Sequence, residues 1–269
     1  MTVFAERHTA GLEQVAGRLE ERARRLEAQR DSRCVFTCAY ALMTRRIAAE
    51  LPKSDVRDPD WVIALAHDFA ARYEAALTAW DEKTSLPAGW QVVFSTICAR
   101  RTSVIEDLIF AMASHIMRDL PHALLATGLT GADGSSRIAD YHIVNRIMGD
   151  SIDDIQLIVS KRYGHYVRWL DHVGGGYDEI LTNYGVRLSR GMAWYNALRL
   201  ADPASARAAA ESIERSPGVF VHEVMNPPLV SIRLALRAAR FIVALLRRWP
   251  ASETNHGPAA PKRGASDHG

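Results

Sequence analysis

Two side chains that often bind metals, His115 and Asp119, stand four residues apart in the segment SHIMRDLPHALL (residues 114–125). Residues of an α-helix advance by about 100° each, so both side chains would rise from one face. An imidazole nitrogen and a carboxylate oxygen one turn apart can hold a divalent cation such as zinc, as two of its four or more ligands. His122, seven residues after His115, would fall on the same face.

Pro121 leaves a second interpretation of this segment open. Its ring would clash with the carbonyl of Met117, so the helix must kink or end near this point. If the helix ends, Asp119 becomes the N-cap of a new helix. His115 would then be a core histidine that bonds a backbone carbonyl. The segment therefore predicts either half of a metal site or an ordinary helix end.

A second polar cluster, DYHIVN (residues 140–145), follows the glycine- and serine-rich loop TGLTGADGSS. His142 would supply a third metal ligand and Asp140 a catalytic carboxylate, if the loop brings them toward Asp119. Asn145 lies one turn from His142 on the same side and is a further pocket candidate. Asp140 also falls in the first turn of a predicted helix, where a carboxylate favours the helix dipole without any catalytic role.

A third pattern alternates steps of three and four along a predicted helix, and its members are Ile155, Ile158, Arg162, His165, Trp169 and His172. This stripe begins apolar and becomes cationic and aromatic. It could line a cavity in which Arg162 binds an anion, His165 acts as an acid or base, and Trp169 forms a wall. The alternative is a core face whose polar end emerges into solvent.

The elements that must position these residues are all helical. Residues 5–30 carry Leu12, Val15, Leu19 and Leu26 at helical spacing, and Asp58 before Pro59 is typical of a helix start. No segment shows the two-residue alternation of a strand. We expect an all-α fold of about ten helices in one domain, residues 1–250, followed by a small, polar, disordered tail, residues 251–269.

The last predicted helix, from residue 229 to about residue 248, carries arginines on one side and apolar residues on the other. Arg233, Arg237 and Arg240 form the first group, and Leu229, Ile232 and Leu236 belong to the second. The pattern favours a packing helix with a solvated arginine face. A membrane-surface or partner-binding helix is the alternative.

The composition excludes several classes of protein. A chain of 269 residues with a net charge of +2 has no general attraction to nucleic acid. Its three cysteines, Cys34, Cys38 and Cys98, form no CxxC pair and are expected to be free thiols in a reducing compartment. The start lacks a signal-peptide pattern, and no apolar run approaches the length of a membrane span. We therefore expect a cytoplasmic protein without a transmembrane segment.

Five segments between residues 34 and 150 carry a family resemblance: CAYALMTRRI, FAARYEAALTAW, LPAGWQVVF, FAMASHIMRDLPHALL and DYHIVNRIM. In these the chain resembles the bacterial family called domain of unknown function 5995. That family's most distinctive motif is alanine–histidine–isoleucine ending in aspartate–leucine–proline, and here Ser114 replaces the alanine. The resemblance implies a helical fold and points to His115, Asp119, Asp140 and Asn145, but it brings no established activity.

A fainter similarity extends to helical zinc hydrolases of the phospholipase C and P1 nuclease type, which also use a histidine, three residues and an aspartate. Their later histidine–glutamate pair, one turn apart, has no counterpart in HIVN. The similarity is an analogy in one motif.

Three functions stay open on the sequence. The first is a metal-dependent hydrolase of a small ester or phosphoester, in which His115, Asp119 and His142 hold the ion. The second is a metal-free helical enzyme, of cyclase or isomerase type, that uses the same polar cluster for acid–base chemistry. The third is a non-enzymatic protein that binds a ligand or a partner. A small molecule is the expected partner in the first two.

Overall fold

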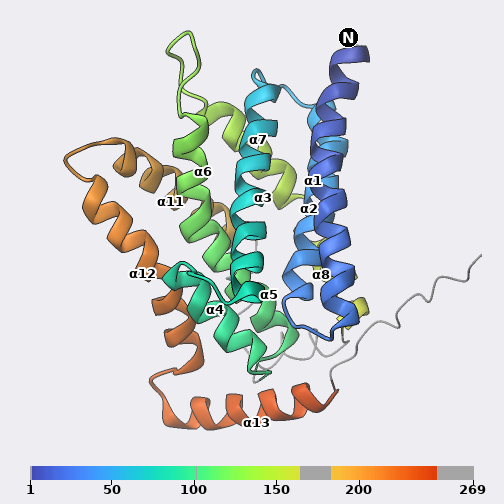
Figure 1. Ribbon diagram of the computed structural model, residues 1–269, viewed down its shortest axis with the longest axis vertical. Helices are drawn as coiled ribbons and strands as arrows, with labels where there is room; N and C mark the ends of the chain where they lie inside the picture. Colours follow the sequence, from blue (N-terminus) through green and yellow to red (C-terminus); the bar gives the residue numbers. More distant parts are fainter. Residues whose placement is uncertain (1, 101, 164–182, 247–269) are drawn as a thin grey trace, which may run out of the picture.

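The computed structural model describes residues 2–100, 102–163 and 183–246, and these form helices joined by turns (Figure 1). The elements are α1 (Thr2–Ala28), α2 (Cys34–Glu50), the 3₁₀ turn η1 (Leu51–Lys53), α3 (Pro59–Glu82), α4 (Ala88–Cys98), α5 (Val104–Ser114), the π-turn η2 (His115–Asp119), α6 (Leu120–Thr127), α7 (Ile138–Gly149), α8 (Ile152–Tyr163), α11 (Asn183–Ala201), α12 (Ala206–Met225) and α13 (Val230–Leu246). Within these ranges no strand occurs, and one isolated bridge joins Thr130 to Ser136. The predicted all-α fold is confirmed.

The long helices α1, α2 and α3 run side by side along the length of the molecule (Figure 1). The apolar stripe predicted for the first of them, Leu12, Val15, Leu19 and Leu26, is fully buried. Helix α3 starts where the sequence predicts. Asp58 accepts a hydrogen bond from the amide of Trp61 at 3.0 Å, and Pro59 is the first helical residue. The amphipathic pattern and the cap together explain why these helices form and how they face inward.

The segment around Pro121 neither ends nor starts a helix. The chain runs without a break from α5 through η2 into α6, and the amide of Leu120 donates to the carbonyl of His115, five residues back. Pro121 has no N–H to donate, and a wider turn gives its ring room. Asp119 keeps helical dihedrals and makes no capping bond, so the N-cap interpretation of this residue is wrong.

The core consists of two apolar clusters that share partly buried side chains. One lies mainly between α1, α2, α3, α4 and α5, and the other between α3, α6, α7 and α11. Tyr40, Met43 and Met112 pack against both. Because these side chains join the clusters, α2 and α5 lie at the centre of the fold, and the candidate site described below occupies that junction.

The remaining helices depart from the sequence patterns in two places. On α8, Ile155 is buried but Ile158 is 44% exposed, so the three-and-four stripe is not one face. The end of that stripe, residues 165–172, and the predicted tail lie outside the described residues. None of the helices in the described ranges is long and apolar enough to cross a membrane.

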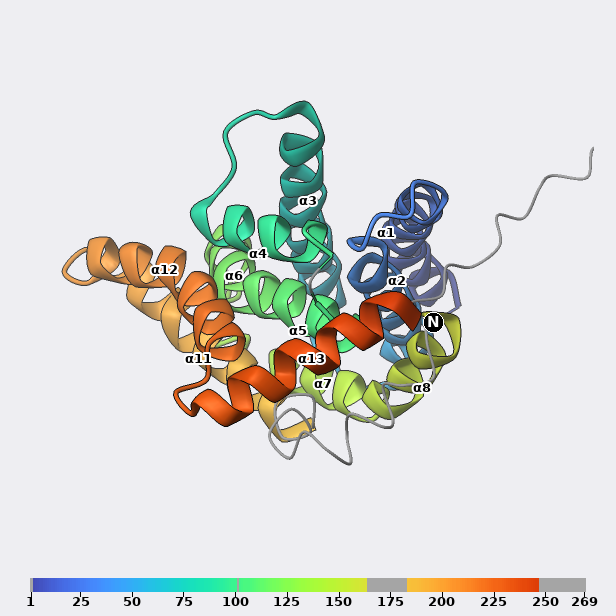
Figure 2. The same ribbon diagram turned by 90° about the horizontal axis from the view of Figure 1, so that it is seen from below.

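The last helix, α13, lies across one end of the bundle (Figures 1 and 2). The sequence pattern favours an arginine face in solvent here, and this holds for the exposed Arg237 but not for Arg240. Arg240 is only 7% exposed and pairs with Glu106 of α5 at 2.6 Å, whereas apolar side chains such as Leu234 face outward.

Candidate functional site

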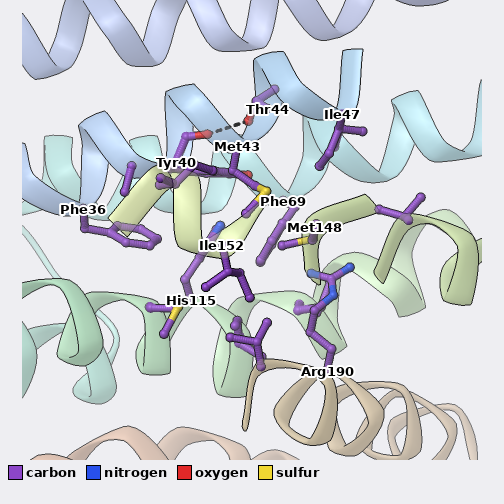
Figure 3. A pocket seen from close by; sticks show the side chains of 18 of the residues that line it. Phe36, Tyr40, Met43, Thr44, Ile47, Phe69, His115, Met148, Ile152 and Arg190 are labelled. Carbon is purple, nitrogen blue, oxygen red and sulfur yellow. Dashed lines mark hydrogen bonds between the residues drawn. The ribbon is translucent and has the colours of Figure 1, made fainter. Parts of the chain in front are cut away.

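A cavity of about 130 Å³ lies at the junction of the two apolar clusters (Figure 3). Polar groups reach it from four elements: Tyr40 and Thr44 of α2, His115 of η2, Gln156 of α8 and Arg190 of α11. Its apolar lining includes Phe36, Met43, Phe69, Met112, Ile152 and Val186. A mainly apolar hollow with a few polar groups from separate helices is the usual form of a small-molecule site.

The carboxylate of Asp119 orients the His115 ring through a contact with its Nδ1 atom. Nδ1 of His115 lies 3.0 Å from Oδ2 of Asp119, and both residues are buried. The same oxygen accepts a hydrogen bond from Nε1 of Trp90 at 3.0 Å, and Oδ1 accepts one from Arg118 at 2.7 Å. Asp119 does not itself line the cavity. The carboxylate therefore fixes the orientation of the ring, and the ring is the group that a ligand would meet.

The other ring nitrogen of His115, Nε2, is buried and has no hydrogen-bond partner among the described residues. The ring stacks on Phe69, with centroids 3.5 Å apart and planes within 5°, and lies 4.7 Å from the Tyr40 ring. Burial lowers the pKa of His115, and the Asp119 carboxylate opposes this shift only in part. Because Asp119 accepts the hydrogen on Nδ1, the neutral ring keeps its lone pair on Nε2.

Arg190 is the cationic group of the cavity. Its side chain is 3% exposed, its Nε donates to Oδ1 of Asn145, and its guanidinium carbon lies 5.0 Å from the Tyr141 ring centroid. Two other buried arginines, Arg33 and Arg240, each pair with a carboxylate. Within the described part of the chain, Arg190 has no such partner in ion-pair range. Because a buried charge is stabilised by a counter-charge, an anion bound beside Arg190 would be favourable.

The second predicted cluster, around residues 140–145, does not reach the cavity as a unit. Asp140 is buried, but its carboxylate accepts hydrogen bonds from the backbone amides of Arg57 at 3.0 Å and Asp58 at 2.9 Å. It therefore fastens the loop before α3. His142 is exposed on the other side of α7. Of the three polar residues predicted for the site here, only Asn145 approaches it, through its bond to Arg190, although the apolar Val144 of the same segment lines the cavity.

The other predicted residues lie apart from the cavity. Arg162 pairs with Glu27 of α1 at 2.7 and 2.8 Å and does not line the hollow. His122 is half-buried in α6, and burial followed by the charge of Arg118 lowers its pKa, but it does not line the cavity either. His165 and Trp169 lie outside the described residues.

The predicted metal ligands do not converge. His115 and Asp119 bond to each other, and His142 is remote from both. Among the residues that the structure describes, no three histidine, cysteine or carboxylate side chains form a group that could hold a metal ion. Asp119 already accepts three donors, which leaves it little capacity for a cation.

Sequence reasoning missed Arg190, Tyr40 and Phe69. A signal for the first exists in α11, where residues at steps of four and three form a buried stripe: Val186, Arg190, Ala193 and Ala197. An arginine within an otherwise apolar stripe is a buried cation, and such a cation needs a partner. The two aromatic residues carry no comparable signal, because rings at helical spacing usually form plain core.

The fold and the site together define a class: an all-α protein with a small apolar cavity that contains one guanidinium and one unpaired imidazole nitrogen. The chain belongs to the family of unknown function DUF5995, whose model matches residues 12–227. The match includes every element of the cavity and ends before α13. No curated protein and no solved structure matches the chain.

Proposed function

We propose that this protein binds a small, mainly apolar carboxylic acid in the cavity, with Arg190 as the anchor for the carboxylate. The observation that carries the proposal is the buried guanidinium without a carboxylate partner among the described residues. A planar guanidinium offers paired donors that match the two oxygens of a carboxylate. An anionic ligand would supply the counter-charge that Arg190 does not find among the described residues.

The cavity limits the size of this ligand. An apolar protein cavity of about 150 Å³ accepts benzene, and the hollow here is about 130 Å³. The ligand would therefore have on the order of six to ten non-hydrogen atoms. The aromatic and sulfur-containing lining, Phe36, Phe69, Met43 and Met112, suits a branched or aromatic body.

Calorimetric titration with benzoate, and with benzyl alcohol as a neutral compound of the same size, tests the proposal. Benzoate should bind the wild type more tightly than benzyl alcohol. Arg190→Met should weaken benzoate binding about 10- to 100-fold, since hydrogen bonds to charged groups contribute about 1.5–3 kcal/mol. Arg187→Met changes an exposed arginine of the same helix and should leave binding unchanged. Equal benzoate affinity in Arg190→Met and wild type would rule out the anchor.

A second function, metal-free proton transfer, is favoured by Nε2 of His115. In the neutral ring this nitrogen is a base at the wall of the cavity, and Asp119 would stabilise the imidazolium that forms when it takes a proton. A ligand held by Arg190 could present an acidic C–H to it. The electron pair of that bond would move onto an adjacent carbonyl oxygen and give an enolate, which regains a proton from the imidazolium.

Deuterium exchange tests this second function without knowledge of the full reaction. The branched 2-oxo acid 3-methyl-2-oxobutanoate, in deuterated water, should exchange its C3 hydrogen faster with the wild type than without protein, as followed by NMR. His115→Gln should abolish the acceleration and Asp119→Asn should reduce it. If binding persists but no variant differs from wild type in exchange, the protein is a binder and not this kind of catalyst.

A further inference from the structure

Helix α13 does not turn its apolar side to the bundle, as an amphipathic surface helix usually does. Two of its arginines bond to the protein: Arg240 is buried against Glu106, and the half-buried Arg233 donates to the carbonyl of Pro227 at 3.0 and 3.2 Å. The outward side is apolar, and Val230, Leu234 and Phe241 are 64%, 60% and 68% exposed. These three residues follow steps of four and seven, so they form one stripe.

The described part of the segment that carries this stripe has cationic but no acidic side chains. From Val224 to Leu246 it contains three arginines, Arg233, Arg237 and Arg240, and no aspartate or glutamate. Arg237 is exposed and lies beside Phe241 along the helix surface. Arg237, Arg240 and His222 also line the groove between α4, α12 and α13, and no acidic side chain does so in the described part of the chain.

The position of α13 leaves the stripe accessible. The helix forms the lower edge of the molecule in Figure 1 and crosses its near face in Figure 2, which is seen from below. The bonds of Arg240 to Glu106 of α5 and to the carbonyls of Val224 and Met225 hold it in this place. Because the helix is held by its polar side, its apolar side stays outward without loss of folded structure.

We propose that α13 docks the protein onto the surface of an anionic phospholipid bilayer. Val230, Leu234 and Phe241 would insert among the acyl chains, while Arg237 meets lipid phosphates at the edge of the stripe. A second copy of this chain fits less well, because face-to-face pairing of two such helices would bring arginine against arginine. A lipid surface supplies both the apolar phase and the negative charge.

Cosedimentation of the full chain with vesicles tests this surface. Vesicles of phosphatidylcholine with phosphatidylglycerol should pellet the protein, pure phosphatidylcholine should pellet much less, and salt should release it. Leu234→Gln with Phe241→Gln should lower the partition constant at least about tenfold. The matched control, Leu188→Gln with Met192→Gln, removes two equally exposed apolar side chains from α11 and should leave binding intact.

Light scattering on the same proteins measures whether the stripe is covered by a second copy of the chain. Circular dichroism checks that the variants stay folded. Equal pelleting of the α13 variant and wild type would overturn the proposal. So would a wild-type dimer that the α13 variant abolishes, since the stripe would then be covered by a second copy. Equal binding to neutral and anionic vesicles would remove the role of the arginines.

Discussion

The carboxylate of Asp119 holds Nδ1 of His115 at 3.0 Å across a single π-helical turn. The wider turn keeps the two side chains on one face although Pro121 lies two residues beyond the carboxylate. Trp90 and Arg118 hold the same carboxylate from other directions. The result is an imidazole whose only unpaired nitrogen is the one at the cavity wall, as far as the described residues show.

Replacement of Asp119 by asparagine should destabilise the protein by about 3 kcal/mol, because one partner of a buried, charged group of side chains is lost. The amide cannot accept from Trp90, His115 and Arg118 together. Urea unfolding followed by circular dichroism measures the change. Asp150→Asn, at an exposed carboxylate after α7, is the control and should change stability by less than about 0.5 kcal/mol. Equal midpoints for both variants would contradict a central role for Asp119.

The free energy of unfolding should decrease below about pH 6.5, because His115 takes up a proton more readily in the unfolded chain than in the folded protein. Burial holds the pKa of this residue below its ordinary 6.5, so the folded protein binds fewer protons than the unfolded chain between the two pKa values. Its contribution is complete above pH 6.5 and is lost as the pH falls through the folded pKa. The difference in unfolding free energy between wild type and His115→Gln should therefore shrink toward acid pH.

His122 titrates in the same direction, but it is present in both of these proteins, so its contribution cancels. His142→Gln, at an exposed position on α7, serves as the matched control for the loss of a histidine side chain and should leave the unfolding free energy at neutral pH as in wild type. A constant difference between wild type and His115→Gln at all pH values would mean that the imidazole is as easily protonated in the folded state as in the unfolded chain.

We expect Asp140 to stabilise the fold and to take no part in ligand binding. Asp140→Ala removes two acceptors from backbone amides before α3 and should cost about 1–3 kcal/mol. Binding of benzoate to the folded variant should not change, because Asp140 does not line the cavity. His142→Ala, two residues on but exposed, should leave both quantities unchanged. If Asp140→Ala lost benzoate binding with little loss of stability, Asp140 would have to be part of the binding site.

Metal removal should have no effect on stability. The described side chains supply at most one histidine and one fully bonded carboxylate at η2, which is too few ligands for a structural zinc. Thermal melts with zinc, with EDTA and with neither should coincide. A melting temperature that rises with zinc and falls with EDTA in wild type, but not in His115→Ala, would restore the metal hypothesis.

The sequence by itself determined the helices and much of their inward faces. The stripe from Leu12 to Leu26 and the Asp58–Pro59 start follow from periodicity and capping, which depend on neighbours in the chain. The same local geometry placed His115 and Asp119 on one face. The family also follows from the sequence, through the resemblance of the motif around these residues and the match of the family model.

Only the tertiary structure decided which polar residues meet. Arg190 reaches the cavity from a helix distant in the sequence, whereas Asp140, a member of the predicted cluster, bonds to a loop. On α13 the pattern showed two faces, but only packing against Glu106 decided that Arg240 lies inward while Arg237 stays exposed. The physical reason is that periodicity determines which side of a single helix each side chain lies on. Which sides of two helices face each other depends on how all the helices pack around the core.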